Sequence, residues 1–418
     1  MPTLPIRTVR RARWAVAAVF FVNGAVFGSW APHIPLVQER LGLGPGVLGA
    51  ALLAMAVGAL AAMPLAGALI GRVGSAAVTR VTTLLLCVSL PLPVLAPNLF
   101  SLAAALFLLG SANGAMDVAM NAHGIAVERH LGRPVMSSFH GMFSTGGLAG
   151  AAIGAIFLGW LPPVVHVLAM AALLGLVAVL ALAHLLPARV DAGATGAMFA
   201  LPGRATLVLG ALAFLVLMSE GAVLDWSAAY LRGDLGASPS LAAMGFAAFS
   251  ATMAAARFCG DRLRHRLGAS ALVQGSAALA AIGLGLALLA GTPAAGVAGF
   301  ACAGLGLANI VPVLFGGAAG RLQGEEPGKA IAAVTTTGYL GFLAGPPLIG
   351  FAAEASTLGT SLGLVVLACA VAAVAARRAL SGAEAGPPQA TPAALDVSRP
   401  PTPPARAAGG GCRRSRRR

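Results

Sequence analysis

The chain has 418 residues, of which 58% are hydrophobic and only 10% are charged, and its mean hydropathy is +0.88. Soluble globular proteins average about 25% charged residues, so this chain has too few charges to cover a surface in water. We therefore exclude a water-soluble protein. Because one membrane-spanning helix needs about 20 apolar residues, the length allows roughly a dozen spans joined by short loops.

The positive charge and the cysteines also exclude several classes. Half of the net charge of +14 lies in the tail 377–418, which is rich in Pro, Ala and Gly and is expected to be disordered. The remaining charge fits the loops of a membrane protein, so we expect no nucleic-acid partner. The five cysteines are scattered, without C-x-x-C spacing. We therefore expect no disulfide framework, no metal site and no cofactor.

Apolar runs between turn residues predict the spans in chain order. The first run follows four arginines, but it is too long for a secretory signal and lacks a cleavage site, so we read it as an uncleaved span. Eleven more runs follow it. The twelve predicted spans are residues 14–34, 46–70, 77–96, 99–127, 136–160, 163–186, 206–231, 240–258, 270–290, 294–318, 330–352 and 356–376.

The basic residues predict the orientation. If the N-terminus is cytoplasmic, all of the 27 Lys and Arg residues except Arg40 and Arg232 fall in cytoplasmic segments. Arg257 is counted here with the loop after the eighth span. Cytoplasmic loops carry the excess of Lys and Arg in membrane proteins. We therefore predict a multi-pass protein of the bacterial inner membrane with both termini in the cytoplasm.

The chain reads as a duplicated six-span unit. Similar basic, glycine-bearing turns follow the second and the eighth span, at Gly67-x-x-x-Gly71-Arg72-x-Gly74 and at Gly260-Asp261-Arg262. Paired bundles of this kind are the architecture of alternating access. The predicted segments are a basic N-terminal arm 1–13, a bundle 14–186, a central loop 187–205, a bundle 206–376 and a tail 377–418.

The turn after the second span, together with the predicted architecture, resembles the major facilitator superfamily. Four stretches are similar to its sugar-permease-like branch, which includes fucose permease and bacterial relatives. They are Trp30-Ala-Pro-His-Ile-Pro35, Asp117-Val-Ala-Met-Asn121-Ala-His-Gly124, Ser137-Ser-Phe-His140-Gly and Glu220-Gly-Ala-Val-Leu-Asp225-Trp226-Ser. The resemblance implies an all-α membrane fold of twelve helices in two pseudo-symmetric six-helix bundles, with spans 1, 4, 7 and 10 around a central cavity. It also implies a monomer.

Three acids fall within predicted spans, where a charge costs about 2.5–3.5 kcal/mol on insertion scales. Asp117 shares one helical face with Asn113 and Asn121, at a spacing of four residues. Such a polar face indicates either a solute-accessible site or a cluster that holds helices together. The resemblance to fucose permease-like proteins implies a proton and substrate site at Asp117 and Asn121. Glu220, deep in the seventh span, is the second candidate for proton coupling.

Other polar residues at depth are candidates for substrate binding. In the first span Asn23 and Trp30 lie on one face, and an amide beside an aromatic ring suits a sugar. His140 in the fifth span and Asn309 in the tenth complete the set, and each of these positions also fits a packing role. Asp225, beside Trp226, is assigned to gating or structure, as are three residues of the basic turns, Arg72, Asp261 and Arg262.

These features predict a secondary active transporter for a small polar solute such as a sugar or polyol, coupled to protons and working by alternating access. A proton-driven exporter of drugs or metabolites with the same fold is the alternative. A polytopic membrane enzyme is a distant one, because His140 and Ser144 lack a third partner for nucleophilic catalysis. No ATP-binding loop is present in the sequence, and we expect no enzymatic activity.

Overall fold

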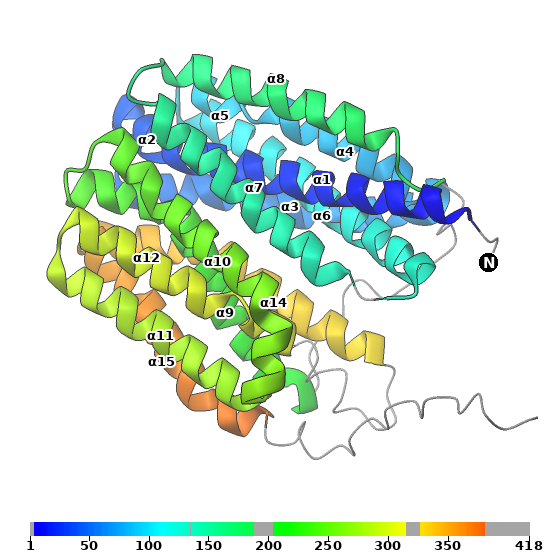
Figure 1. The fold of residues 1–418 in the computed structure, drawn as a ribbon. Coiled ribbons are helices and arrows are strands. Elements are labelled where there is room, and N and C mark those ends of the chain that lie inside the picture. Colours follow the sequence, from blue (N-terminus) through cyan, green and yellow to red (C-terminus); the bar gives the residue numbers. More distant parts are fainter. Residues whose placement is uncertain (1–3, 134, 188–203, 315–326, 381–418) are drawn as a thin grey trace, which may run out of the picture. The chain divides into compact units, whose positions relative to one another are not determined.

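The computed structural model describes residues 4–133, 135–187, 204–314 and 327–380, and every regular element in these residues is helical (Figure 1). The elements of the first half are α1 Ile6–Trp30, η1 Ala31–His33, α2 Ile34–Leu41, α3 Pro45–Val73, α4 Ser75–Ser89, α5 Leu92–Leu95, α6 Leu99–Leu131, α7 Met136–Phe157 and α8 Pro163–Leu182. Those of the second half are α9 Arg204–Ala229, η3 Tyr230–Asp234, α10 Pro239–Leu267, α11 Ala269–Ala290, α12 Pro293–Leu307, α14 Pro327–Glu354 and α15 Leu358–Leu380.

The helices follow the predicted spans. Within the described residues, ten helical stretches are long and apolar enough to cross a bilayer. The helices α7 and α14 lie where the fifth and eleventh spans are predicted, which is consistent with twelve spans. The predicted all-α membrane fold is thereby confirmed.

Several helix ends differ from the predicted boundaries. α1 begins at Ile6, so the arginines of the predicted arm 1–13 form its first turns. α10 continues to Leu267, well past the predicted end at 258, and α15 continues to Leu380, past 376. An apolar run marks only the part of a helix that lies in hydrocarbon, whereas the helix itself continues into water on charged residues. The predicted central loop 187–205 and the rest of the tail lie almost entirely outside the described residues.

The two halves are built alike. In the first half α1 packs on α7 and α3 on α6, and in the second half α9 packs on α14 and α10 on α12. A single glycine joins α3 to α4 and another joins α10 to α11. Both adopt a positive φ that disfavours any side chain, 83° at Gly74 and 79° at Gly268. Gly74 belongs to the first of the two predicted basic turns. Gly260-Asp261-Arg262, predicted as the second turn, lies inside α10 instead, and the chain turns only at Gly268.

Residues 1–384 form one compact unit, in which the two halves contact each other mainly through two pairs of helices. α7 packs on α10, and α3 packs on α14. In Figure 1 the helices of residues 6–182 lie in the upper part and those of residues 204–380 in the lower part. Polar residues of α6, α7, α9, α10 and α14 meet near these contacts.

Candidate functional site

The carboxylate of Asp117 links the two halves. It lies half-buried on α6 of the first half, and the Tyr339 hydroxyl on α14 of the second half donates a hydrogen bond to its Oδ2. Its Oδ1 accepts a hydrogen bond from the Asn121 side chain at 3.1 Å, one turn further along the same helix. Each carboxylate oxygen therefore has a partner, and one of the two partners belongs to the other half of the chain.

The polar face of α6 continues towards α1. The side-chain amide of Asn23 donates to Oδ1 of Asn113 at 3.0 Å. Asn23 is buried, whereas Asn113, Asp117 and Asn121 are each half-buried. The structure therefore brings together four of the residues that the sequence analysis singled out, on two neighbouring helices. An amide pair beside a carboxylate offers donors and acceptors to a solute with hydroxyl groups.

A second polar cluster surrounds Arg257. Its Nη2 lies 3.6 Å from Oε2 of Glu220 on α9, and its Nη1 donates to the Ser144 hydroxyl on α7 at 2.7 Å. The side chains of Arg257 and Glu220 are only 13% and 12% exposed. The assignment of Arg257 to a loop was wrong. It lies in α10, ten residues before the helix ends, and it pairs with an acid within the protein.

His140 borders the same cluster. Its backbone carbonyl lies 3.5 Å from Arg257 Nη1, and its ring packs edge-on against Phe20 of α1 with ring centroids 5.3 Å apart. His140 is exposed, although Phe20 is fully buried. The exposed His140, in the second turn of α7, therefore lies at the edge of the Arg257 cluster.

The other predicted residues do not take part in the described hydrogen bonds of the Asp117 and Arg257 side chains. Trp30 and Asp225 are fully buried, and their side-chain polar atoms have no hydrogen-bond partner among the described residues. Asn309, two residues after the end of α12, is buried and donates to the Ala256 carbonyl at 3.0 Å, so its amide ties this segment to α10. Arg72 and Arg262 are exposed at the surface. The side chain of Asp261 lies outside the described residues.

The two halves meet closely at one end of the unit, which we call the closed end and which is formed by residues 35–49, 229–238 and 346–359. Glu39 and Arg232 form an ion pair at 2.7 Å across the halves. The Gly46 amide, in the first turn of α3, donates to Oε2 of Glu354 at the end of α14, at 2.8 Å. The opposite end, where α1 begins and α15 stops, is called the basic end.

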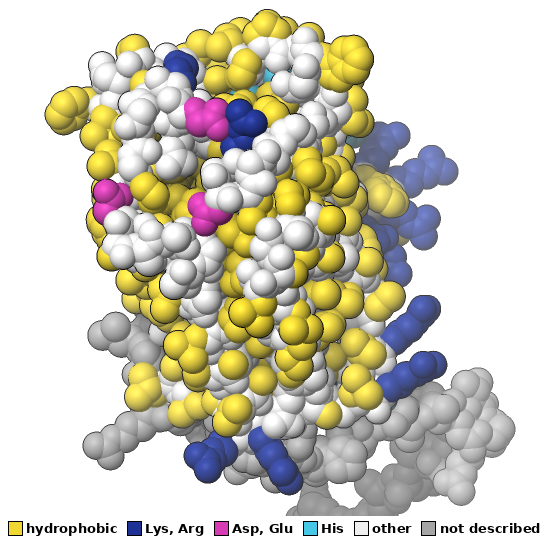
Figure 2. All heavy atoms as spheres, turned by 90° about the vertical axis from the view of Figure 1, so that its left-hand side faces the viewer, with side chains coloured by type: hydrophobic (Ala, Val, Ile, Leu, Met, Phe, Trp, Pro, Cys, Tyr) yellow, Lys and Arg dark blue, Asp and Glu magenta, His cyan; other side chains and the backbone are white. Residues whose placement is uncertain are grey.

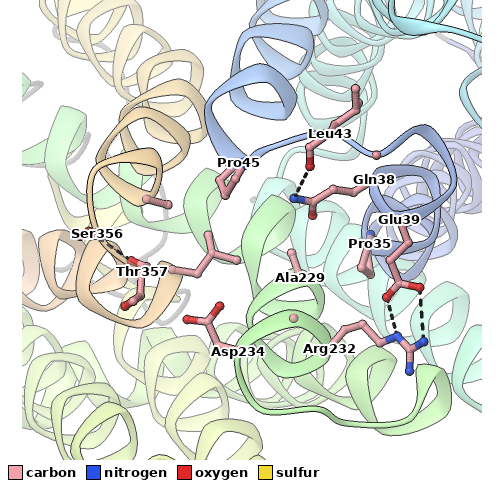
Figure 3. Close-up of a pocket in the computed structure, with 14 residues that line it drawn as sticks. Pro35, Gln38, Glu39, Leu43, Pro45, Ala229, Arg232, Asp234, Ser356 and Thr357 are labelled. Carbon is pink, nitrogen blue, oxygen red and sulfur yellow. Dashed lines mark hydrogen bonds and ion pairs between the residues drawn. The ribbon is translucent and has the colours of Figure 1, made fainter.

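A hollow of about 430 Å³ opens at the closed end (Figure 3). Its walls come from both halves, with Gln38 and Glu39 on one side and Arg232, Asp234 and Thr357 on the other. Figure 2 looks onto this end: acidic side chains lie on the upper part of the face, and most of the visible basic side chains project at the right-hand and lower margins. The ion pair of Glu39 and Arg232 belongs to the walls of the hollow, and none of the residues that line the hollow belongs to the Asp117 or Arg257 clusters.

Sequence reasoning missed Tyr339 and Arg257 as members of the polar clusters. Tyr339 is one of only two tyrosines and falls within a predicted span, which would have marked it as a polar residue at depth. Arg257 falls inside the predicted eighth span 240–258 but was treated as a loop residue. No group of His, Cys, Asp or Glu in the described part of the chain has the arrangement needed to hold a metal ion.

The fold and the interior clusters define a polytopic helical membrane protein with two similar bundles. Comparison with known proteins identifies the class. The profile of the Major Facilitator Superfamily matches residues 208–414. An uncharacterised MFS-type transporter of Yersinia pestis is 38% identical over 359 residues, which cover 86% of this chain and 93% of that protein. An uncharacterised transporter of Sinorhizobium fredii is 39% identical over 365 residues, covering 86% and 96%.

The chain belongs to the Major Facilitator Superfamily, so the expectation of a transporter rather than an enzyme is confirmed. Solved structures show the same fold. The nucleoside transporter NupG, as a point mutant, superposes with a TM-score of 0.68 at 12% identity, covering 88% of this chain and 99% of NupG. The fucose:proton symporter FucP of E. coli, also as a point mutant, superposes with a TM-score of 0.60 at 15% identity, covering 88% and 98%.

Proposed function

We propose that this protein is a secondary active transporter that moves a small polar solute by alternating access and couples that movement to protons. The observation that carries the proposal is the bond between Asp117 of the first half and Tyr339 of the second. The Asp117 carboxylate can take up a proton, and it forms part of the contact between the two halves, which must move relative to each other during alternating access. Proton binding and rearrangement of the halves are thus linked at one carboxylate.

The sign of this coupling follows from hydrogen-bond strength. An ionised carboxylate accepts a charge-assisted hydrogen bond, which is roughly twice as strong as a neutral one. With Asp117 ionised, the bond from Tyr339 holds the halves together at this depth. When Asp117 takes up a proton, its charge disappears and the link weakens. We assign Glu220 as the second proton-coupling residue. Its carboxylate pairs with Arg257 of its own half, so its protonation changes the charge balance of that pair.

A polar cargo is supported by the side chains beside Asp117. Asn113 and Asn121 lie on α6 together with Asp117, and Asn23 lies on the neighbouring α1. Their side chains supply amide donors and acceptors. The printed names of two structurally similar proteins, a nucleoside transporter and a fucose:proton symporter, support the same class of cargo. We assign these asparagines and His140 to the solute site, together with Trp30 at the end of α1 that leads to the closed end.

We place the protein in the bacterial inner membrane with the basic end in the cytoplasm. The exposed Arg72 and Arg262, in the last turns of α3 and α10, lie at that end, and cytoplasmic segments carry most Lys and Arg in membrane proteins. The closed end then faces the periplasm. We assign gating to the contacts of this end and to Arg72, Asp261 and Arg262 at the other.

The experiment is a measurement of proton movement in proteoliposomes that contain the purified chain and a pH-sensitive dye. A panel of sugars, polyols and drug-like cations is added, and the parent is compared with Asp117→Asn. Alkalinisation of the outer medium on solute addition supports symport, and acidification supports the proton-driven exporter. Proton movement that is equal in the parent and in Asp117→Asn would refute the role of Asp117, and no solute-dependent movement with any compound would refute coupling.

A further inference from the structure

Arg257 is the one described basic side chain that the structure places among the interior polar clusters. It is held from three sides: Glu220 of α9, Ser144 of α7 and the backbone carbonyl of Ala308, which lies 3.5 Å from its Nε. An arginine at membrane depth is costly, and such residues mark substrate or ion pathways. A neutral sugar or polyol does not require this charge.

The pairing between Arg257 and Glu220 is loose. The nearest oxygen, Oε2, stands 3.6 Å from Nη2, beyond a hydrogen bond, and the other oxygen, Oε1, is buried without a hydrogen-bond partner among the described residues. Guanidinium and carboxylate normally pair through two parallel hydrogen bonds at about 2.7–2.9 Å. Arg257 therefore keeps unused donors, and Glu220 balances its charge without saturating it.

We propose that Arg257 binds a carboxylate on the cargo, so that the solute is a small organic monoanion such as a sugar acid or a hydroxy acid. This inference rests on the proposed transport function and narrows its substrate class. The guanidinium fork matches a carboxylate in two hydrogen bonds. Ser144 fixes the orientation of the fork through Nη1, which leaves the edge next to Glu220 for the incoming anion.

Charge balance links this binding to the proton. In the empty site the positive charge of the Arg257 guanidinium and the negative charge of the Glu220 carboxylate balance each other. When a carboxylate of the cargo displaces Glu220, one negative charge is left in excess, and Glu220 removes it by taking a proton from the water on the same side. Anion and proton then cross together, and both leave on the other side. Near Arg257, α9 brings Glu220 and α7 brings His140, whereas the described parts of α11 and α12 carry no charged side chain.

A structural role of the pair is the competing explanation, in which Arg257 and Glu220 only hold α10 to α9. The two explanations differ in what happens when both charges are removed together. The double variant Glu220→Gln/Arg257→Gln keeps the side-chain lengths and leaves no unpaired charge in the interior. If the pair is only structural, this variant binds the same solutes as the parent.

The test uses matched compounds that differ in one carboxylate: glucuronate with glucose, gluconate with sorbitol, and lactate with propane-1,2-diol. Binding is measured on the purified full-length protein as ligand-dependent thermal stabilisation, and transport is measured as proton movement in proteoliposomes. We expect an anionic member to bind the parent and its neutral counterpart not to. We expect the double variant to lose about tenfold or more in affinity for the anion.

Two further variants keep the result decisive. Arg266→Gln removes an exposed arginine from the same helix and should leave binding unchanged. Arg257→Lys retains the charge without the fork, and we expect it to keep the preference for anions at lower affinity. The inference is overturned if no anionic compound stabilises the parent, or if the double variant binds the anion as the parent does. Proton movement driven by a neutral sugar and dependent on Asp117 would overturn it while leaving the proposed function intact.

Discussion

A methyl group at Gly350 is predicted to open the closed end. Gly350 of α14 faces α3 of the other half, and a Cβ built on it would lie 2.7 Å from the Pro45 carbonyl oxygen and 2.9 Å from the Gly49 Cα. Ordinary contact begins at 3.4 Å, so the two backbones must separate by about half an ångström or more. Overpacking of this kind costs about 1–3 kcal/mol.

The cost falls mainly on the state in which the closed end is shut, because α3 and α14 part when it opens. A change of about 1–3 kcal/mol shifts a two-state equilibrium about 5- to 150-fold. The Cβ would also lie 3.0 Å from the Trp226 ring, which belongs to the same half as Gly350 and adds strain in either state. That second contribution lowers thermal stability without favouring either state.

The assay is alkylation of a cysteine at a buried position of the closed end. Ala353→Cys suits this purpose, since Ala353 of α14 is buried at the closed end, next to the Glu354 contact with α3. The native cysteines are replaced first, and a membrane-impermeant reagent is added outside intact cells. We expect Gly350→Ala to raise the alkylation rate by about 5- to 150-fold, because the rate follows the open population.

The control for Gly350→Ala is Gly363→Ala in α15, where nothing lies within 4 Å of an added Cβ. This change should leave the alkylation rate near that of the parent. Equal rates in the two variants would refute the conclusion that the Gly49–Gly350 contact holds this end shut.

Three smaller effects test other contacts. Glu354→Gln removes the negative charge that caps the first turn of α3 from the other half, so it should raise the same alkylation rate by a factor that corresponds to about 0.5–1 kcal/mol. Glu39→Gln removes a partly exposed ion pair, and its effect should stay below about 1 kcal/mol and disappear in about 1 M salt, as rates measured at both ionic strengths will show. Gly74→Ala forces a side chain onto a backbone with φ of 83° and should lower the stability by about 1–3 kcal/mol, seen as a lower melting temperature in detergent, whereas Gly71→Ala, with nothing within 4 Å, should not.

The helices could be predicted from the sequence because hydropathy reports directly which residues face hydrocarbon. The same signal fails where a helix leaves the bilayer. α10 continues to Leu267 on basic residues, and Arg257, which lies before that exit, looked like the first residue of a loop. A hydropathy profile cannot distinguish an arginine that faces water from one that pairs with an acid on another helix.

The polar clusters were predicted in part. The face shared by Asn113, Asp117 and Asn121 follows from helical spacing alone, and the structure places these residues together. The bond from Tyr339 to Asp117 joins residues 222 positions apart, so it depends on how α14 packs against the first half. Asn309 shows that a polar residue within a predicted span need not belong to a site. It is an amide at the expected depth, but packing directs it to the backbone of α10.

The most direct test of proton-coupled transport is accumulation of a labelled solute in proteoliposomes under an imposed proton gradient, using whichever compound drives proton movement. For a symporter, we predict that the parent accumulates the solute above the outside concentration when the gradient points inward and loses this ability with Asp117→Asn. Uphill accumulation that depends on an outward gradient would identify the exporter instead. Equilibration without accumulation, equal in the parent and in Asp117→Asn, would contradict proton coupling and leave a facilitator.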